Sequence, residues 1–232
     1  MCHDITVNRN ILFHPQSECY NMPMKKGLFI TFEGPDGSGK TTVSTEVCRR
    51  LEAEGYPVRY TREPGGSAIA EQIRKVILDP ENTAMDARTE ALLYAASRRQ
   101  HLVEKVLPAL EEGIHVISDR FVDSSLAYQG RGRKIGIDEV FAINQFAIEG
   151  HMPVKTVYLD VDPEVGLERI RKNRTWLDRL DQESVEFHER VLEGYREVIE
   201  RYRDRMIIID ANRSADEVIN DAYMAVKGLL DA

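Results

Sequence analysis

The residues from Gly34 to Thr41, GPDGSGKT, have the types and spacing of a phosphate-binding loop. Its glycines let backbone N–H groups approach phosphate oxygens that a Cβ atom would keep away. Lys40 adds a mobile positive charge for the β- and γ-phosphates of a nucleotide, and the Thr41 hydroxyl is suited to bind Mg²⁺. The segment therefore predicts nucleotide binding.

The segments on either side of this loop support that interpretation. Leu28–Glu33 is a short apolar run of the kind found in buried parallel strands. After the loop, Val43, Val47 and Leu51 recur every four residues and predict a helix that ends near Gly55. A helix that begins at the loop also turns its dipole toward an anion. The alternative, a glycine-rich turn with a chance lysine, is disfavoured by this strand–loop–helix order.

The composition excludes several other classes of protein. The chain has 232 residues, 42% of them hydrophobic, and a net charge of −8, which supports a sizeable core and disfavours a protein that binds DNA or RNA. Its three cysteines are widely spaced and indicate reduced thiols in a cytoplasmic protein rather than a zinc site. No apolar run approaches the roughly 20 residues that a membrane span requires.

The order of the predicted elements indicates an α/β fold. Residues 1–23 show no periodicity, and we expect them to form a disordered extension. In residues 24–232, strands and helices alternate, which predicts one domain with a parallel sheet and helices on both faces. Further strands are expected at Val58–Thr61, Ile114–Ser118, Val154–Asp160 and Met206–Asp210, and helices at Ile137–Ile148 and Ser214–Leu230.

A long helix is predicted after Asp86, with its buried stripe running from Ala91 to Leu110. Tyr94 and Arg98 lie one turn apart and can face a cleft together. The pattern alone favours a half-buried tyrosine beside a solvated arginine. The spacing also places Arg99 nearer the centre of the stripe than Arg98, so it does not choose between them.

Two further segments carry charge that can act on phosphates. Asp119 and Arg120 follow a predicted strand, and ligands of open parallel sheets bind at the carboxyl ends of strands. We expect the carboxylate to help hold Mg²⁺ and the guanidinium to reach a phosphate, with a structural salt bridge as the alternative. A basic stretch at about residues 169–181 predicts a mobile lid over phosphates rather than a solvated face.

Taken together, these stretches resemble thymidylate kinases from about Leu28 to the C-terminus. The block with Asp-Arg, Ser-Ser and Ala-Tyr-Gln is specific to that family, whereas many kinases share the phosphate loop. The matching segments are Phe32–Thr42, Thr61–Gly66, Arg88–Arg98, Asp119–Gly130 and Arg179–Glu183. The resemblance implies a phosphate-loop NTPase-like three-layer fold with a five-stranded parallel sheet and a lid. It also implies ATP, dTMP and Mg²⁺ as ligands and a cytoplasmic homodimer that serves dTTP synthesis.

The resemblance assigns roles to individual residues. ATP would contact Gly34, Pro35, Asp36, Gly37, Ser38, Gly39, Lys40, Thr41 and Thr42, with Mg²⁺ at Thr41 and Asp119. The acceptor would contact Asp36 at the 3′-hydroxyl, Tyr94 by stacking, Arg98, Ser125 and Gln129 at the base edge, and Tyr128 at C2′, with Glu63 and Arg74 near the sugar or phosphate. Arg120 would bridge the two phosphate chains.

The position of the catalytic arginine distinguishes types within the family. Some members carry it inside the phosphate loop, where this chain has Gly37, so the basic lid indicates the bacterial type. The candidates are Arg171, Arg174 and Arg179, which spacing does not separate. We favour Arg174 as the catalytic residue, with Arg179 holding the lid helix.

The proposed chemistry needs no general base, because the second ionisation of a phosphate monoester has a pKa of about 6. Another phosphate-loop kinase, acting on a deoxynucleoside or a different nucleoside monophosphate, is the main alternative. A small GTPase-like switch is disfavoured because the chain has no Asn-Lys-x-Asp segment.

Overall fold

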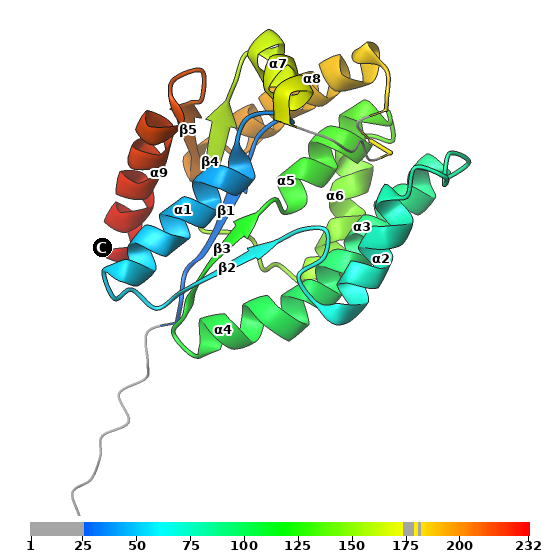
Figure 1. The fold of residues 1–232 in the computed structure, drawn as a ribbon. Helices are drawn as coiled ribbons and strands as arrows, with labels where there is room; N and C mark the ends of the chain where they lie inside the picture. Colours follow the sequence, from blue (N-terminus) through cyan, green and yellow to red (C-terminus); the bar gives the residue numbers. More distant parts are fainter. Residues whose placement is uncertain (1–25, 174–178, 181) are drawn as a thin grey trace, which may run out of the picture.

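The computed structural model describes residues 26–173, 179–180 and 182–232, and it contains one sheet of five parallel strands (Figure 1). Their order across the sheet is β2-β3-β1-β4-β5. The strands are β1 (Phe29–Glu33), β2 (Val58–Arg62), β3 (His115–Asp119), β4 (Lys155–Asp160) and β5 (Met206–Asp210). The predicted fold class is confirmed, and each strand end lies within one residue of its prediction. The extension predicted at residues 1–23 lies outside the described residues.

Helices cover both faces of the sheet. On one face lie α1 (Lys40–Ala53) and α9 (Ala215–Leu230), which pack on each other and on the sheet (Figure 1). The other helices are α2 (Ala68–Leu78), α3 (Ala87–His101), α4 (Leu107–Glu111), α5 (Val122–Ser125), α6 (Ile137–Ile148), α7 (Pro163–Asn173) and α8 (Val185–Arg201), with a short 3₁₀ turn at Arg203–Arg205. Within the described part of the chain, no helix has the length and apolar character needed to cross a bilayer.

The central strand β1 is buried along its whole length and has two different faces. Ile30 and Phe32 point into the core beneath α1 and α9, whereas Phe29 joins the opposite core. Because side chains alternate along a strand, Thr31 and Glu33 share the second face with Phe29. The sequence therefore places a carboxylate at the end of a buried strand, beneath the loop that follows β3.

The long helix predicted after Asp86 is not regular. A π-helical segment, η1 (Leu102–Val106), separates α3 from α4. Pro108 accounts for this interruption, because proline lacks an N–H and its ring crowds the carbonyl four residues earlier, which a wider turn relieves. A second π-helical segment, η2 (Leu126–Gly132), follows α5 and was not predicted.

The close approach of α8 to η2 depends on glycine, because a Cβ atom at Gly194 would lie 2.8 Å from the Cα atom of Ala127 and 2.8 Å from the Cβ atom of Arg131. We expect Gly194→Ala to lower the free energy of unfolding by about 1–3 kcal/mol through overpacking. In α9, a Cβ atom at Gly228 would meet nothing within 4 Å. Gly228→Ala is the matched control and should raise stability by about 0.5–1 kcal/mol. Urea denaturation measures both, and equal effects of the two substitutions would contradict this packing argument.

Candidate active site

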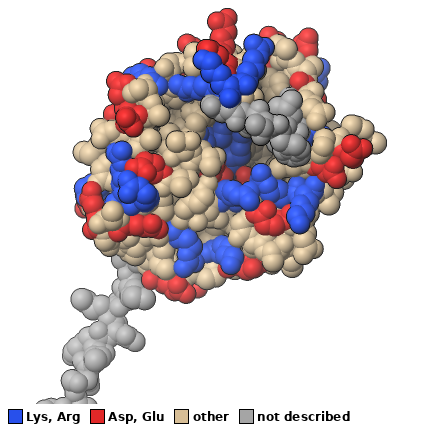
Figure 2. Space-filling view, in the orientation of Figure 1, with Lys and Arg blue, Asp and Glu red and all other residues tan. Residues whose placement is uncertain are grey.

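A cavity of about 660 Å³ lies at the carboxyl ends of the strands. Its walls come from the loops that follow β1, β2, β3 and β5, and from α3, η2 and α7. Figure 2 shows Lys and Arg side chains within and around a hollow on this side of the molecule. The cavity therefore has the position and the charge of a site for an anionic ligand.

The predicted phosphate loop connects β1 to α1 and forms part of the cavity wall. Gly37 adopts a φ of 80°, and a Cβ atom there would lie 2.2 Å from the carbonyl oxygen of Gly166 in α7. A side chain at this position is excluded both by the backbone conformation and by the neighbouring helix. The packing of α7 thus requires glycine at this position.

Lys40, the first residue of α1, is almost completely buried. Its Nζ atom donates to the carbonyl oxygens of Gly34 at 2.9 Å and Pro35 at 2.8 Å, both in its own loop. Burial, together with the positive charge of Arg120, lowers the pKa of Lys40 to about 8. The side chain is therefore charged at neutral pH and lies where phosphate oxygens can replace its carbonyl partners.

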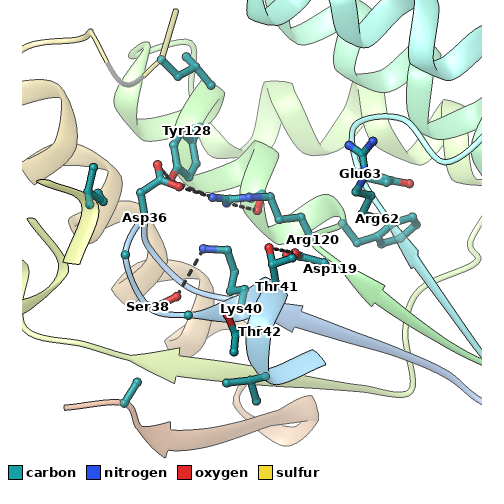
Figure 3. Close-up of a pocket in the computed structure, with 18 of the residues that line it drawn as sticks. Asp36, Ser38, Lys40, Thr41, Thr42, Arg62, Glu63, Asp119, Arg120 and Tyr128 are labelled. Carbon is teal, nitrogen blue, oxygen red and sulfur yellow. Dashed lines mark hydrogen bonds and ion pairs between the residues drawn. The ribbon is translucent and has the colours of Figure 1, made fainter. Parts of the chain in front are cut away.

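Thr41 and Asp119 form an adjacent pair of oxygen groups (Figure 3). The Thr41 hydroxyl donates to Oδ2 of Asp119 at 2.5 Å, which links the start of α1 to the end of β3. Ser38 and Thr42 line the same part of the cavity. Within the described segments, no group of three or more His, Cys, Asp or Glu side chains is arranged to hold a metal. A cation here would need further ligands from a bound molecule.

Arg120 lies between the phosphate loop and the rest of the cavity (Figure 3). Its backbone is left-handed, with a φ of 73°, and its Nη2 atom donates to Oδ1 of Asp36 at 2.7 Å. The Tyr128 hydroxyl donates to Oδ2 of the same carboxylate at 2.7 Å. Asp119 and Arg120 are thus bonded to α1 and to the phosphate loop, and Arg120 does form a salt bridge within the protein, with Asp36.

Glu33 is a buried carboxylate to which the sequence analysis gave no role. Oε1 accepts from the backbone N–H groups of Phe121 at 2.7 Å and Ser124 at 3.2 Å. Oε2 accepts from the hydroxyls of Ser124 at 2.5 Å and Tyr195 at 3.1 Å. Burial and the nearby Asp123 carboxylate raise the pKa of Glu33 to about 7. The sequence contained one signal that could have identified Glu33, because it is an acidic residue at the end of an apolar strand.

The far end of the cavity is lined by Tyr94 and Arg98 from α3. Tyr94 is 9% exposed and Arg98 only 1%, so the favoured expectation of a half-buried tyrosine beside a solvated arginine is wrong. The side chain of Arg99 is instead 40% exposed and pairs with Glu149 on the surface. Contacts with several elements bury the side chain of Arg98, and helical spacing within one segment does not report them.

Four described protein acceptors surround the guanidinium of Arg98. Nε donates to Glu63 at 2.8 Å and Nη2 to the carbonyl of Phe121 at 2.9 Å. Nη1 donates to Ser125 at 3.0 Å and to Asn144. Since arginine has five N–H groups, one N–H on Nη2 remains for a ligand.

Glu63 and Arg74 also line the cavity, and both are anchored to neighbouring residues. Besides Arg98, the Glu63 carboxylate contacts Nδ1 of His101 at 2.9 Å. Nη1 of Arg74 donates to the carbonyl of Pro64 at 2.8 Å. The loop after β2 is thereby held between α2 and α3.

Gln129 lines the cavity from η2, and its Nε2 atom donates to Glu90 at 2.8 Å. Glu90 also accepts from Arg179 at 2.6 Å, so this arginine is 7% exposed and bonded within the protein. Arg171 is exposed near the end of α7, whereas Arg174 lies outside the described residues. The basic stretch thus has an anchored end at Arg179.

The opposite end of the cavity is formed by the start of the predicted lid, at Arg169 and Ile170, and by residues for which no ligand was predicted. The latter are Ala211, Arg213, Ser214, Ala215 and Val218. Arg169 is held by the carbonyl of Ala211 at 2.9 Å. Most of these residues follow the carboxyl end of β5, so the strand-end rule applied to that strand would have identified them.

Comparison with known proteins finds a family model, sequence relatives and a solved structure that agree with one another. A thymidylate kinase family model matches residues 32–222. The chain is 57% identical over 202 residues to a thymidylate kinase of Geobacillus sp. (strain WCH70), which covers 87% of this chain and 96% of that protein. It is also 57% identical over 208 residues to a thymidylate kinase of Clostridium novyi (strain NT), at 89% and 100% coverage. The crystal structure of a thymidylate kinase from Ehrlichia chaffeensis matches with a TM-score of 0.70 at 32% identity, covering 89% of this chain and 100% of that one.

The raised pKa of Glu33 predicts a pH-dependent contribution to stability. In the fold the carboxyl stays protonated up to about pH 7, whereas in the unfolded chain it ionises near pH 4.5. Its contribution is therefore fully present below pH 4.5 and is lost as the pH rises through 7, a loss of about 3 kcal/mol. Glu33→Gln mimics the neutral acid, because the hydroxyls of Ser124 and Tyr195 can accept from the new NH₂ group instead of donating to a carboxylate. The free energy of unfolding of the wild type relative to that of Glu33→Gln should therefore fall by about 3 kcal/mol between pH 4.5 and pH 8.

Urea denaturation between pH 4.5 and pH 8 measures this difference. Glu112→Gln, at an exposed position in the turn after α4, is the control for simple loss of a carboxylate. A wild-type profile that runs parallel to that of Glu33→Gln would show that Glu33 is ionised throughout this range in the folded protein.

Proposed function

Because this chain belongs to the thymidylate kinase family, we propose that it phosphorylates dTMP to dTDP, with ATP as phosphate donor and Mg²⁺ as cofactor, in dTTP synthesis. The observation that carries this proposal is the single cavity that extends from the phosphate loop, past Arg120, to Tyr94 and Gln129. Two nucleotides can therefore meet head to head at Arg120. The chain is proposed to act as a cytoplasmic homodimer, and the exposed side chain of Phe146 offers apolar surface for the second copy.

The phosphate loop and Lys40 form the proposed donor site. The phosphate oxygens of ATP would replace the loop carbonyls that now accept from Lys40. Arg169 and Arg213 also line this end of the cavity, and the adenosine would lie beside them. This arrangement accounts for the residues after β5 that form part of the cavity.

Thr41 and Asp119 are the residues that would hold Mg²⁺. One hydroxyl and one carboxylate suit an ion that prefers oxygen ligands and completes its coordination with water and phosphate. When bound, the ion would neutralise part of the charge on the transferring phosphate.

The opposite end of the cavity is the proposed acceptor site. Tyr94 would stack on the thymine, and the base edge would meet Arg98, Ser125 and Gln129. Tyr128 would crowd C2′, and its partner Asp36 would meet the 3′-hydroxyl. Glu63 and Arg74, which are fixed at the loop after β2, would contact the sugar or the phosphate.

Catalysis would consist of positioning and charge stabilisation. The acceptor phosphate is ionised at neutral pH and attacks the γ-phosphorus without a general base. Arg120 would contact both phosphate groups, and Arg174 would add charge from the lid. Their charges would offset the repulsion between two polyanions as these approach each other.

A substrate panel tests this function directly. We expect ADP release with ATP and Mg²⁺ in the presence of dTMP, little with UMP, dCMP or thymidine, and none after chelation of the metal. The assay couples ADP formation to a dehydrogenase and includes dUMP to measure the tolerance for a missing methyl group. A preference for thymidine or UMP would assign the chain to another kinase class.

Lys40→Ala should lower kcat/KM for ATP on the order of 10²–10³-fold, because it removes the positive charge that would stabilise the transferring phosphate. Lys75→Ala removes an equal charge from the exposed face of α2, outside the cavity, and should leave the rate unchanged. Steady-state kinetics compares both variants with the wild type. Activity retained by Lys40→Ala would refute the assignment of the donor site.

A further inference from the structure

Glu90 is a buried carboxylate that joins α3 to Gln129 in the cavity wall and to two arginines behind that wall. It lies in the first turn of α3 and has no exposed surface. Its oxygens accept from Gln129 at 2.8 Å, Arg133 at 3.1 Å and Arg179 at 2.6 Å. Although burial opposes ionisation, the hydrogen bonds from these groups hold the pKa of Glu90 below its usual range. The group is therefore an acceptor with a fixed negative charge.

This charge determines how the carboxamide of Gln129 is oriented. A carboxylate only accepts hydrogen bonds, so the NH₂ group of Gln129 must face Glu90. The carboxamide oxygen makes no hydrogen bond with any residue in the described ranges. That oxygen is consequently the atom of Gln129 that is left to accept a hydrogen bond from a ligand.

The remaining partners keep Glu90 in this position. Arg133, at the end of η2, also pairs with Glu183 at 2.6 Å. Arg179 donates to the carbonyl of Ile77 at 2.8 Å and thus fixes the carboxylate against the end of α2. Two guanidinium groups held from different elements leave the carboxylate little freedom to rotate away from Gln129.

An acceptor at this position discriminates between pyrimidines. Thymine and uracil carry an N–H at ring position 3, whereas cytosine carries a lone pair there, which would face the carboxamide oxygen of Gln129 without a hydrogen. A polar site built to accept from an N–H rejects an analogue that lacks it, because a buried acceptor is left unpaired.

We propose that Glu90 is a positioning residue for base selection: by fixing the carboxamide of Gln129 with its oxygen toward the cavity, it makes the site select pyrimidine monophosphates with an N–H at ring position 3. This inference rests on the proposed function and extends it to a residue that does not touch the substrate.

The test compares kcat/KM for dTMP and dCMP at saturating ATP. In Glu90→Gln, the new carboxamide can pair with Gln129 in either orientation, so the preference for dTMP over dCMP should fall on the order of 10²-fold. The KM for dTMP should rise more than kcat falls, since Lys40 and Arg120 are unaltered. Glu90→Asp keeps the negative charge but draws the carboxylate back by one methylene group, so it should lower the same preference, and it decides the question if Glu90→Gln does not fold.

Two controls separate base selection from a merely structural effect. Glu104→Gln removes a carboxylate that holds the amide of Gln100 at 3.0 Å outside the cavity, and it should keep the wild-type preference. If Glu90 acts through Gln129, adding Glu90→Gln to Gln129→Met should change the dTMP/dCMP ratio no further. Glu90 variants that keep the wild-type ratio would overturn this inference, whereas an unaltered chain inactive with dTMP would refute the proposed function instead.

Discussion

The pairing of carboxylates with arginines, buried at Glu63 and Glu90 and half-buried at Asp36, is the constraint on which the cavity depends. Asp36 holds Arg120, Glu63 holds Arg98, and Glu90 holds Arg179. Arginines that lie near one another repel each other and have flexible side chains. Removing one member of such a buried pair typically costs about 3–5 kcal/mol, because an unpaired charge is left behind. The pairs therefore fix each arginine at one position before a ligand binds.

The exit of β3 shows how the sheet itself contributes to this arrangement. Arg120 follows the last residue of the strand in a left-handed conformation, which a side chain other than glycine adopts only at a cost of about 1–2 kcal/mol. Glu33, at the end of the neighbouring strand β1, accepts the N–H groups of Phe121 and Ser124 just beyond it. These bonds compensate the strained turn, so the side chain of Arg120 points back over the phosphate loop.

The sheet and the phosphate loop could be predicted because their signals are local. Apolar runs bounded by turns located every strand, and the spacing of Gly34 to Thr41 located the loop. The burial of Arg98 could not be predicted, since it depends on Glu63, 35 residues earlier in the chain, and on Asn144 in α6. The interruption of the long helix did have a local signal in Pro108, which the apolar stripe obscured.

The resemblance implied that Arg179 holds the lid helix, but its buried partner could not be predicted, for a similar reason. A run of basic residues in sequence does not reveal which members have a buried acidic partner, and Glu90 lies 89 residues earlier in the chain. The described part of the basic stretch therefore divides into exposed residues such as Arg171 and anchored residues, Arg169 at its start and Arg179 at its end. Only three-dimensional contacts distinguish an arginine that can move toward a ligand from one that holds the segment in place.

Asp36 places a negative charge inside a loop that is built for phosphates, and its neighbours explain why this is tolerated. Arg120 and the Tyr128 hydroxyl occupy its two oxygens, while Lys40 is bonded to the loop carbonyls. The charges of the loop are thus compensated internally, so in the proposed function a phosphate would exchange partners with Lys40 without forcing a new arrangement. The Asp36–Arg120 pair also joins the loop after β1 to the loop after β3. Because the two loops are bonded directly, the groups that would hold the donor and the acceptor phosphates keep a fixed separation, which in-line transfer requires.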